Sequence, residues 1–220
     1  MASTNVNRPN GFSASRYLDG SPFNGQTEAY AFSASQANNA YIGDMVQIDD
    51  TNRSTALTLN YLPGVLFIKP VVSALTTGVF RGVIAGFVPE PDFNQTATAS
   101  LGLKYRVLST ARYAWVVQDP GVIFTAQEDG QSYVSASDNA LNRTSDVAYT
   151  AGSATTGVSG AQLDSSDVQE AAARPWRYLR YTQRPDNFGF VAADTLSYAK
   201  FDVLMANSDL VQAVATQYGT

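Results

Sequence analysis

The stretch from Tyr105 to Gln127, YRVLSTARYAWVVQDPGVIFTAQ, constrains the fold more than any other part of the chain. Residues 113–118 alternate with the period of a strand, and apolar side chains fall on both of its faces. Asp119-Pro120-Gly121 then predicts a turn, because proline fixes φ and glycine adopts a positive φ at little cost. Residues 122–124 continue as a second strand, so we expect a hairpin. A strand that is apolar on both faces favours a sandwich or closed barrel over an open sheet.

Further short apolar or alternating runs predict a mainly β protein. We expect strands at residues 30–32, 41–48, 80–88, 176–183, 188–191 and 198–205, with shorter pieces between 57 and 72. Gly82 and Gly86 predict a bulge or a close backbone approach within 80–88. The architecture we expect is an antiparallel β-barrel or a jelly-roll-like β-sandwich.

One or two short helices are expected beside the strands. Ser166 stands three residues before Gln169, the spacing of a capping box, and the alanines that follow favour a helix over residues 166–173. Pro175 ends it. The tail from residue 206 onward is short and amphipathic, with apolar side chains at helical spacing.

The first 27 residues differ in composition from the rest of the chain. Residues 1–27 are rich in Asn, Ser, Gly and Pro, with isolated aromatics at Phe12, Tyr17 and Phe23. We interpret them as an extended N-terminal arm outside the core, which either docks on a partner through those aromatics or is a disordered terminus. Residues 28–220 then form a single β domain, with a long polar excursion at about 131–162.

Composition argues against catalysis and against a metal site. The chain has no cysteine and no histidine, so the commonest general base and the commonest metal ligands are missing. Glu90 and Asp92 flank a proline and Asp49-Asp50 lie in a turn, and we interpret both pairs as solvated carboxylates rather than as a glycosidase pair or a calcium site. We therefore expect no enzyme activity, no catalytic residue, no metal and no cofactor.

Charge and hydropathy exclude two further classes of partner. The net charge is −5 and no basic tract is present, so nucleic-acid binding is not expected. No apolar run reaches the roughly 20 residues of a membrane helix, and the polar N-terminus does not match a targeting signal. Charged residues make up 15% of the chain, against about 25% for a typical soluble domain. A surface of uncharged polar residues loses less on desolvation and suits permanent protein contacts.

Four arginines gather near the end of the chain, at positions 174, 177, 180 and 184. If residues 176–183 form a strand, Arg177 shares one face with Leu179 and Tyr181, while Arg180 lies on the other. Either the arginines clamp carboxylates of a partner, or they pair internally with acidic turns. The candidate partner contacts are Phe12, Tyr17, Phe23, Arg174, Arg177 and Arg184.

Segments near both ends resemble the capsid decoration, or cement, proteins of tailed bacteriophages. The opening pieces are Asn7-Arg-Pro-Asn-Gly-Phe12 and Tyr17-Leu-Asp-Gly-Ser-Pro-Phe-Asn-Gly-Gln26. The closing pieces are Leu163-Asp-Ser-Ser-Asp-Val168, Arg174-Pro-Trp-Arg-Tyr-Leu179, Arg184-Pro-Asp-Asn187 and Phe201-Asp-Val-Leu-Met-Ala-Asn207. The middle of the chain is largely unmatched.

The resemblance implies a β-barrel or sandwich on the outer surface of the virion head, with no catalytic residues. Such a protein, made in the bacterial host cytoplasm, decorates and stabilises the icosahedral head by bridging neighbouring major capsid protein subunits. The resemblance also favours a homotrimer over a dimer, because local three-fold positions are common gaps in such shells. The alternative is a receptor- or glycan-binding β module on the virion surface, which the aromatic and Asn-rich loops suggest.

Overall fold

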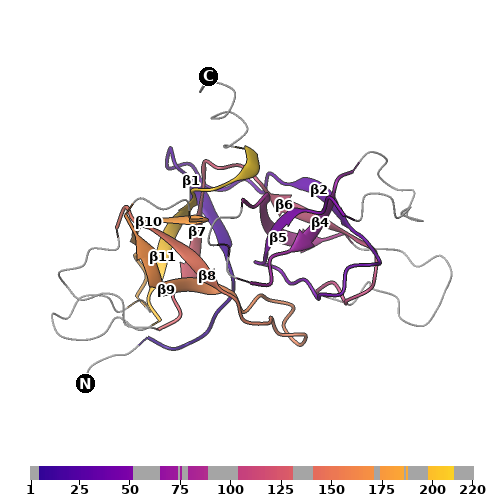
Figure 1. Ribbon diagram of the computed structural model, residues 1–220. Helices are drawn as coiled ribbons and strands as arrows, with labels where there is room; N and C mark the ends of the chain where they lie inside the picture. The colour runs from indigo at the N-terminus through magenta and orange to yellow at the C-terminus, as the bar shows by residue number, and fades with distance from the viewer. Residues whose placement is uncertain are drawn as a thin grey trace.

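The computed structural model describes residues 5–51, 65–73, 75, 79–88, 104–130, 141–170, 174–185, 187 and 198–210. In this part of the chain it contains 11 strands and no helix (Figure 1). The prediction of a mainly β protein is confirmed. The predicted strand at 188–191, the acidic loop with Glu90 and Asp92, and the tail beyond residue 210 lie outside the described residues.

Five strands form a closed barrel in the order β2-β4-β3-β5-β6. Their bounds are β2 (Glu28–Phe32), β3 (Met45–Ile48), β4 (Phe67–Pro70), β5 (Gly82–Phe87) and β6 (Arg112–Val117). β2 and β4 pair in parallel, and the other barrel pairs are antiparallel. The barrel is filled by buried side chains: Tyr30, Phe32, Ala40, Val46, Ile68, Ile84, Ala114 and Val116.

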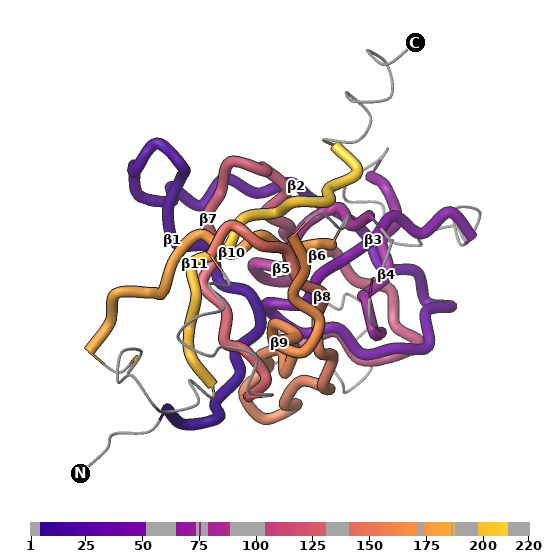
Figure 2. The backbone as a smooth tube through the Cα atoms, turned by 60° about the vertical axis from the view of Figure 1, so that its left-hand side comes forward, coloured from indigo at the N-terminus to yellow at the C-terminus, as the bar shows by residue number. Residues whose placement is uncertain are grey.

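The other six strands form an antiparallel sheet in the order β1-β7-β11-β10-β8-β9. Their bounds are β1 (Ser13–Tyr17), β7 (Val122–Gln127), β8 (Thr144–Ala148), β9 (Gln162–Gln169), β10 (Trp176–Tyr181) and β11 (Lys200–Met205). The sheet lies beside the barrel, and β1 lies at its edge next to β7 (Figure 1 and Figure 2).

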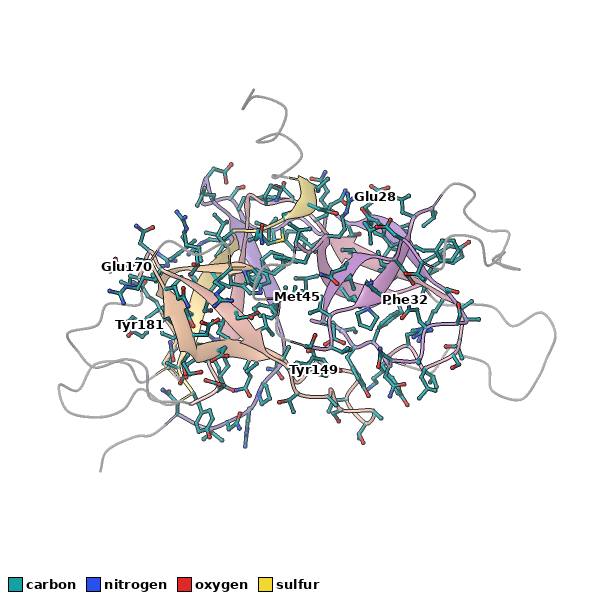
Figure 3. The ribbon with its side chains drawn as sticks, viewed as in Figure 1. Glu28, Phe32, Met45, Tyr149, Glu170 and Tyr181 are labelled. Atoms are coloured by element: carbon teal, nitrogen blue, oxygen red, sulfur yellow. The ribbon has the colours of Figure 1, made fainter. Side chains whose placement is uncertain are left out.

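The sheet and the barrel share one hydrophobic core. The inner face of the sheet supplies Trp176, Phe124 and Phe201 to this core, and the outer face of the barrel supplies Met45 and other side chains. The Trp176 indole N–H donates to Met45 Sδ at 3.1 Å. The Met45 side chain lies between the two units (Figure 3). The barrel therefore has two buried clusters, one in its interior and one that it shares with the sheet.

The two strands predicted around Asp119-Pro-Gly121 are present, but the predicted hairpin is wrong. β6 pairs with β2 and β5 in the barrel, whereas β7 pairs with β1 and β11 in the sheet. Both edges of each strand are already occupied, so the two strands have no edge left for each other. The turn, in which Asp119 accepts the Gly121 N–H at 2.7 Å, instead carries the chain from the barrel to the sheet. The predicted coverage of both faces of 113–117 holds for Tyr113, Ala114, Val116 and Val117, which are buried, but not for Trp115, which is 39% exposed.

The helix predicted over 166–173 is wrong within the described residues. Residues up to Gln169 belong to β9, which pairs with β8 at Ser145–Val168 and Thr144–Gln169. Asp164 accepts the Ser166 N–H and hydroxyl at 2.9 and 2.6 Å, so Ser166 is held by its own strand and caps nothing. The capping signal is local, and pairing with a distant strand outweighs it. Residues 171–173 lie outside the described part.

The N-terminal segment is part of the fold rather than a separate arm. Phe12 is 2% exposed and stacks on Trp176, and β1 pairs with β7. The expectation that residues 1–27 stand outside the core is therefore wrong for residues 12–17. The polar excursion at 131–162 is likewise interrupted, since β8 lies within it and Ala161 and Gln162 are buried.

Both glycines of β5 act as predicted. A Cβ at Gly82 would collide with the carbonyl oxygen of Val117, which marks a close backbone approach. The β5–β6 register shifts between Ile84 and Gly86, which marks a bulge. β5 can therefore curve around the barrel and still pack against the sheet.

Candidate functional site

An open cleft of about 710 Å³ lies where the N-terminal segment passes between the sheet and the barrel. One wall consists of residues 10–15 together with β7, and the other of residues 42–43 and 83–85 from the barrel. Its volume falls in the range of roughly 300–1,000 Å³ that is typical of ligand-binding clefts.

Two glycines allow the N-terminal segment to lie close against the barrel. Gly11 has φ of 64° and Gly43 has φ of 92°, and both line the cleft. A Cβ on either residue would collide with the backbone of the opposite segment. The Phe12 N–H donates to the Gly43 carbonyl at 3.0 Å, so the crossing is fixed by a backbone hydrogen bond.

Three basic side chains line the cleft: Arg8, Arg184 and Lys200. They come from three separate segments of the chain. No aspartate or glutamate is among the described residues that line it. The charged residues among the described part of the lining are thus all basic, in a chain of net charge −5.

Gln127 and Asn187 bring the three basic residues together. Gln127 is buried, accepts the Arg8 N–H at 2.9 Å and is paired with Lys200 across β7 and β11. Asn187 exchanges hydrogen bonds with the Lys200 backbone at 2.7 and 2.9 Å, and its own N–H donates to the Arg184 carbonyl at 3.0 Å. The backbones of Arg8 and Lys200 are thus held by the side-chain amides of Gln127 and Asn187, and the backbone of Arg184 is held by the Asn187 backbone N–H.

A buried carboxyl group lies directly behind the crossing. Asp44 is 1% exposed and accepts the Tyr41 N–H at 2.8 Å. Burial raises the pKa of Asp44 to about 6, and hydrogen bonds from Ser159 and from the Tyr41 backbone oppose that rise. Ser159 and Val158 come from the loop before β9, which bonds to Ile42 of the barrel through the Ser159 N–H at 2.8 Å. The carboxyl group therefore sits where the two units meet.

Half of the predicted contact residues line this cleft, namely Phe12, Phe23 and Arg184. Arg184 is exposed and Phe23 is half-buried. Phe12 reaches the cleft only at its margin, because its ring stacks on Trp176 at 4.2 Å and is almost fully buried. Phe12 is therefore mainly a core residue.

The other predicted contact residues lie elsewhere. The Tyr17 hydroxyl donates to Asn24 at 2.7 Å, and its ring lies 5.9 Å from Phe23. Arg174 is buried, with Asp167 at 2.8 Å and Asp146 at 3.8 Å, so it pairs internally. Arg177 is exposed on the outer face of β10.

The arginines of β10 do not follow simple strand alternation. The β10–β11 register shifts between Tyr178 and Arg180, so Tyr181 returns to the inner face and packs on Phe201 at 4.5 Å. The expectation that Tyr181 shares a face with Arg177 is wrong for this reason. Arg180 bonds to Asp202 at 2.9 Å. Internal pairing thus holds for Arg174 and Arg180, with partners on strands rather than in turns.

Sequence reasoning missed Arg8 and Lys200. Each is an isolated basic residue in its own segment, and only the β1–β7–β11 pairing brings them near Arg184. Arg8 lies within the opening motif Asn7-Arg-Pro-Asn-Gly-Phe12. This motif was the one feature of the sequence that could have drawn attention to Arg8.

Two other kinds of site were sought in the described part of the chain. No group of three or more His, Cys, Asp or Glu side chains that could hold a metal ion occurs among the described residues. No helix among them is long and apolar enough to cross a membrane.

The sequence and the structure were also compared with known proteins. No family model, curated protein or solved structure matches the chain.

Proposed function

We propose that this is a structural virion protein that decorates and stabilises the head of a tailed bacteriophage. It would sit on the outer surface of the capsid and bridge neighbouring major capsid protein subunits. The resemblance of the two ends to decoration proteins supplies the partner. The structural observation that supports docking is the open cleft between the sheet and the barrel, which is lined by the N-terminal segment and by Arg8, Arg184 and Lys200.

The mechanism is passive and needs rigidity rather than chemistry. A protein that bridges two capsid subunits can hold them together only if its own two contact surfaces keep a fixed distance from each other. The sheet and the barrel share the core around Trp176, so surfaces on the two units are held together as one block. A standard stable interface buries about 1,200–2,000 Å² in total. Repetition by the symmetry of the shell turns a modest contact into a strong one.

A second surface on the barrel is available for the other end of the bridge. Trp115 and Leu66 are 39% and 48% exposed. Trp115 pairs with Ala29 of β2, and the Leu66 carbonyl accepts the N–H of Ala31 of the same strand. The two large apolar residues therefore lie on the two strand neighbours of β2 in the barrel. Exposed aromatic residues are typical anchors of protein interfaces.

The oligomeric state that we propose is a homotrimer, with a dimer as the alternative. The same surface on the barrel is a candidate for this self-association.

The location and copy number of the protein in purified phage particles test this function. Cryo-electron microscopy of the heads, with quantitative mass spectrometry of the same particles, would give both. We expect copies spread over the head lattice at sites that join capsid subunits. A few copies confined to the tail would instead support the alternative, a receptor- or glycan-binding module. Absence from the particle would refute both.

A further inference from the structure

We propose that Asp44 is a pH-sensitive switch for the strap, the segment of residues 149–161 that runs from the sheet to the barrel and back. Protonation of Asp44 holds the strap closed on the barrel, and ionisation of Asp44 makes the strap open more often. Because Val158 of the strap lines the cleft together with Ile42 and Gly43 of the barrel unit, each opening also changes one wall of the cleft. The inference rests on packing and charge and does not depend on the proposed function.

Two backbone hydrogen bonds attach the strap to the barrel unit. The strap joins β8 to β9 of the sheet, and Tyr149 at its start lies where the two units meet (Figure 3). Further along, Val158 forms a parallel bridge with Ile42. The Ile42 N–H donates to the Gly157 carbonyl at 3.0 Å, and the Ser159 N–H donates to the Ile42 carbonyl at 2.8 Å. Opening of the strap has to break both bonds.

The strap can open without unfolding the rest of the protein. Residues 153–156 are exposed, so this part of the strap buries little surface of its own. Gly152 lies so close to Tyr41 that a Cβ there would collide with the tyrosine ring. Tyr41 is in turn stacked on Tyr105 at 5.1 Å. The strap therefore rests on an aromatic pair that belongs to the barrel unit, and a segment with few buried contacts opens at low cost.

Asp44 lies buried between the strap and the barrel. It is 1% exposed, and its Oδ2 accepts the Tyr41 N–H at 2.8 Å. A hydrogen bond from Ser159 connects the carboxyl group to the strap. Its Oδ1 has no hydrogen-bond partner in the described part of the chain. A buried carboxylate oxygen without a donor is costly, so the closed strap disfavours the ionised form of Asp44.

No basic residue occurs in the segments that pack around Asp44. These segments are the strap, residues 40–45, residues 82–87 of β5 and residues 10–12 at the glycine crossing. Besides Asp44, their titratable groups are Tyr41 and Tyr149, and a tyrosine cannot supply a positive charge. Burial therefore raises the pKa of Asp44 to about 6 without a neighbouring cation to offset it.

The direction of the switch follows from the closed and open states. In the open state water reaches Asp44, and its pKa returns to the ordinary value of 3.8. Because the pKa is higher in the closed state, protonation favours closure fully below pH 3.8, and this contribution is lost as the pH rises through about 6. Between pH 5 and pH 7 the equilibrium between closed and open strap should therefore shift about tenfold toward the open state.

Hydrogen–deuterium exchange with mass spectrometry tests the switch on the full-length protein. Exchange is measured at pH 5 and pH 7, and the exposure times are corrected for the pH dependence of the chemical exchange rate. Peptides that cover the strap should lose about tenfold in protection between pH 5 and pH 7. At both pH values they should exchange before peptides that cover β10 and β11, because the strap opens without the sheet.

Three variants assign the pH response to Asp44. Asp44→Asn cannot ionise, so the protection of its strap should be the same at both pH values. Ser159→Ala removes a hydrogen bond that opposes the rise in pKa, so its strap should lose protection at a higher pH than that of the wild type. Asp19→Asn is the matched control, since Asp19 lies in the exposed turn after β1, and it should keep the tenfold response of the wild type.

Several results would overturn the proposal. One is equal protection of the wild-type strap at pH 5 and pH 7, and another is a tenfold loss that persists in Asp44→Asn. Exchange of the strap and of β10 and β11 at one common rate would also overturn it, because a common rate means that only the whole protein opens. If Asp44→Asn does not fold, Ser159→Ala decides, and an unchanged pH midpoint in that variant would contradict the switch.

Discussion

At the residue scale, Trp176 is the side chain on which most of the packing depends. It is fully buried, and the rings of Phe12, Phe80 and Phe124 surround it at centroid distances of 4.2, 5.2 and 5.3 Å. Its indole N–H is satisfied by Met45. These contacts come from the N-terminal segment, from the chain before β5, from the sheet and from the barrel. One residue therefore joins four distant segments of the sequence.

Phe12→Ala should be strongly destabilising. The substitution removes the ring stacked on Trp176 and leaves a cavity, so the free energy of unfolding should fall by about 3–5 kcal/mol. Val6→Ala is the control, since Val6 is 60% exposed, and it should change stability by less than about 0.5 kcal/mol. Chemical denaturation of both variants measures the difference. Equal stability of the two would mean that Phe12 does not belong to the core.

Asp44→Asn should change how stability depends on pH. Burial raises the pKa of Asp44 from 3.8 to about 6, so its contribution is fully present below pH 3.8 and is lost as the pH rises through about 6. The loss is about 3 kcal/mol for a shift of about two units. Relative to wild type, Asp44→Asn should therefore gain stability between pH 4 and pH 7. Burial, and then the nearby Asp44, raise the pKa of Tyr149 above its ordinary value, so Tyr149 stays neutral throughout this window and should not obscure the effect. Parallel pH curves for the two proteins would contradict the assignment.

At the element scale, Asp202 joins three strands on the outer face of the sheet. Its Oδ2 accepts hydrogen bonds from Arg16 of β1 at 2.7 Å and from Arg180 of β10 at 2.9 Å, and its Oδ1 accepts the Thr182 hydroxyl at 2.9 Å. The carboxylate side chain is 6% exposed. It therefore fixes the edge strand β1 to the middle of the sheet by charged hydrogen bonds.

Asp202→Asn should lower the free energy of unfolding by about 1–3 kcal/mol, because it weakens hydrogen bonds to two guanidinium groups. Glu170→Gln is the matched control, since the Glu170 side chain is 76% exposed and pairs with Arg143 at the surface. Its cost should stay below about 1 kcal/mol. Urea titrations of the two variants decide the point. A larger loss for Glu170→Gln than for Asp202→Asn would contradict the role given to Asp202.

Strands were predictable from the sequence where their own alternation shows, as in 112–117, 176–181 and 200–205. Their partners were not, because pairing depends on residues far away in the chain. The hairpin at Asp119-Pro-Gly121 and the helix at 166–173 fail for this reason, since local turn and capping signals say nothing about which strand edges are free. The cleft was half predictable: Phe23 and Arg184 stand out by type, whereas Arg8 and Lys200 become a site only through folding.

At the scale of the whole molecule, the sheet and the barrel depend on each other. Met45, Val83 and Val117 of the barrel pack into the core around Trp176. The glycine crossing at Gly11 and Gly43 adds a backbone connection. We therefore expect the sheet, the barrel and the N-terminal segment to unfold together.

Deleting residues 2–25 should abolish folding, because the deletion removes β1 and Phe12 from the shared core.

The full chain should unfold in one thermal transition. Near-ultraviolet circular dichroism reports the buried tryptophan, and its transition should coincide with that seen by far-ultraviolet circular dichroism. A truncated protein with an unchanged melting temperature would show instead that the segment is a free arm.

Reconstitution of undecorated heads with charge-reversed protein tests the central claim, that the cleft is the docking site. Under the proposed function, the phage that carries the gene supplies undecorated heads, which would be mixed with purified protein and sedimented. Wild type and Arg177→Glu should co-sediment with heads to the same extent, while Arg184→Glu combined with Lys200→Glu should remain in the supernatant although its melting temperature is unchanged. If the double variant decorates heads as tightly as wild type, the cleft is not the surface that binds the capsid.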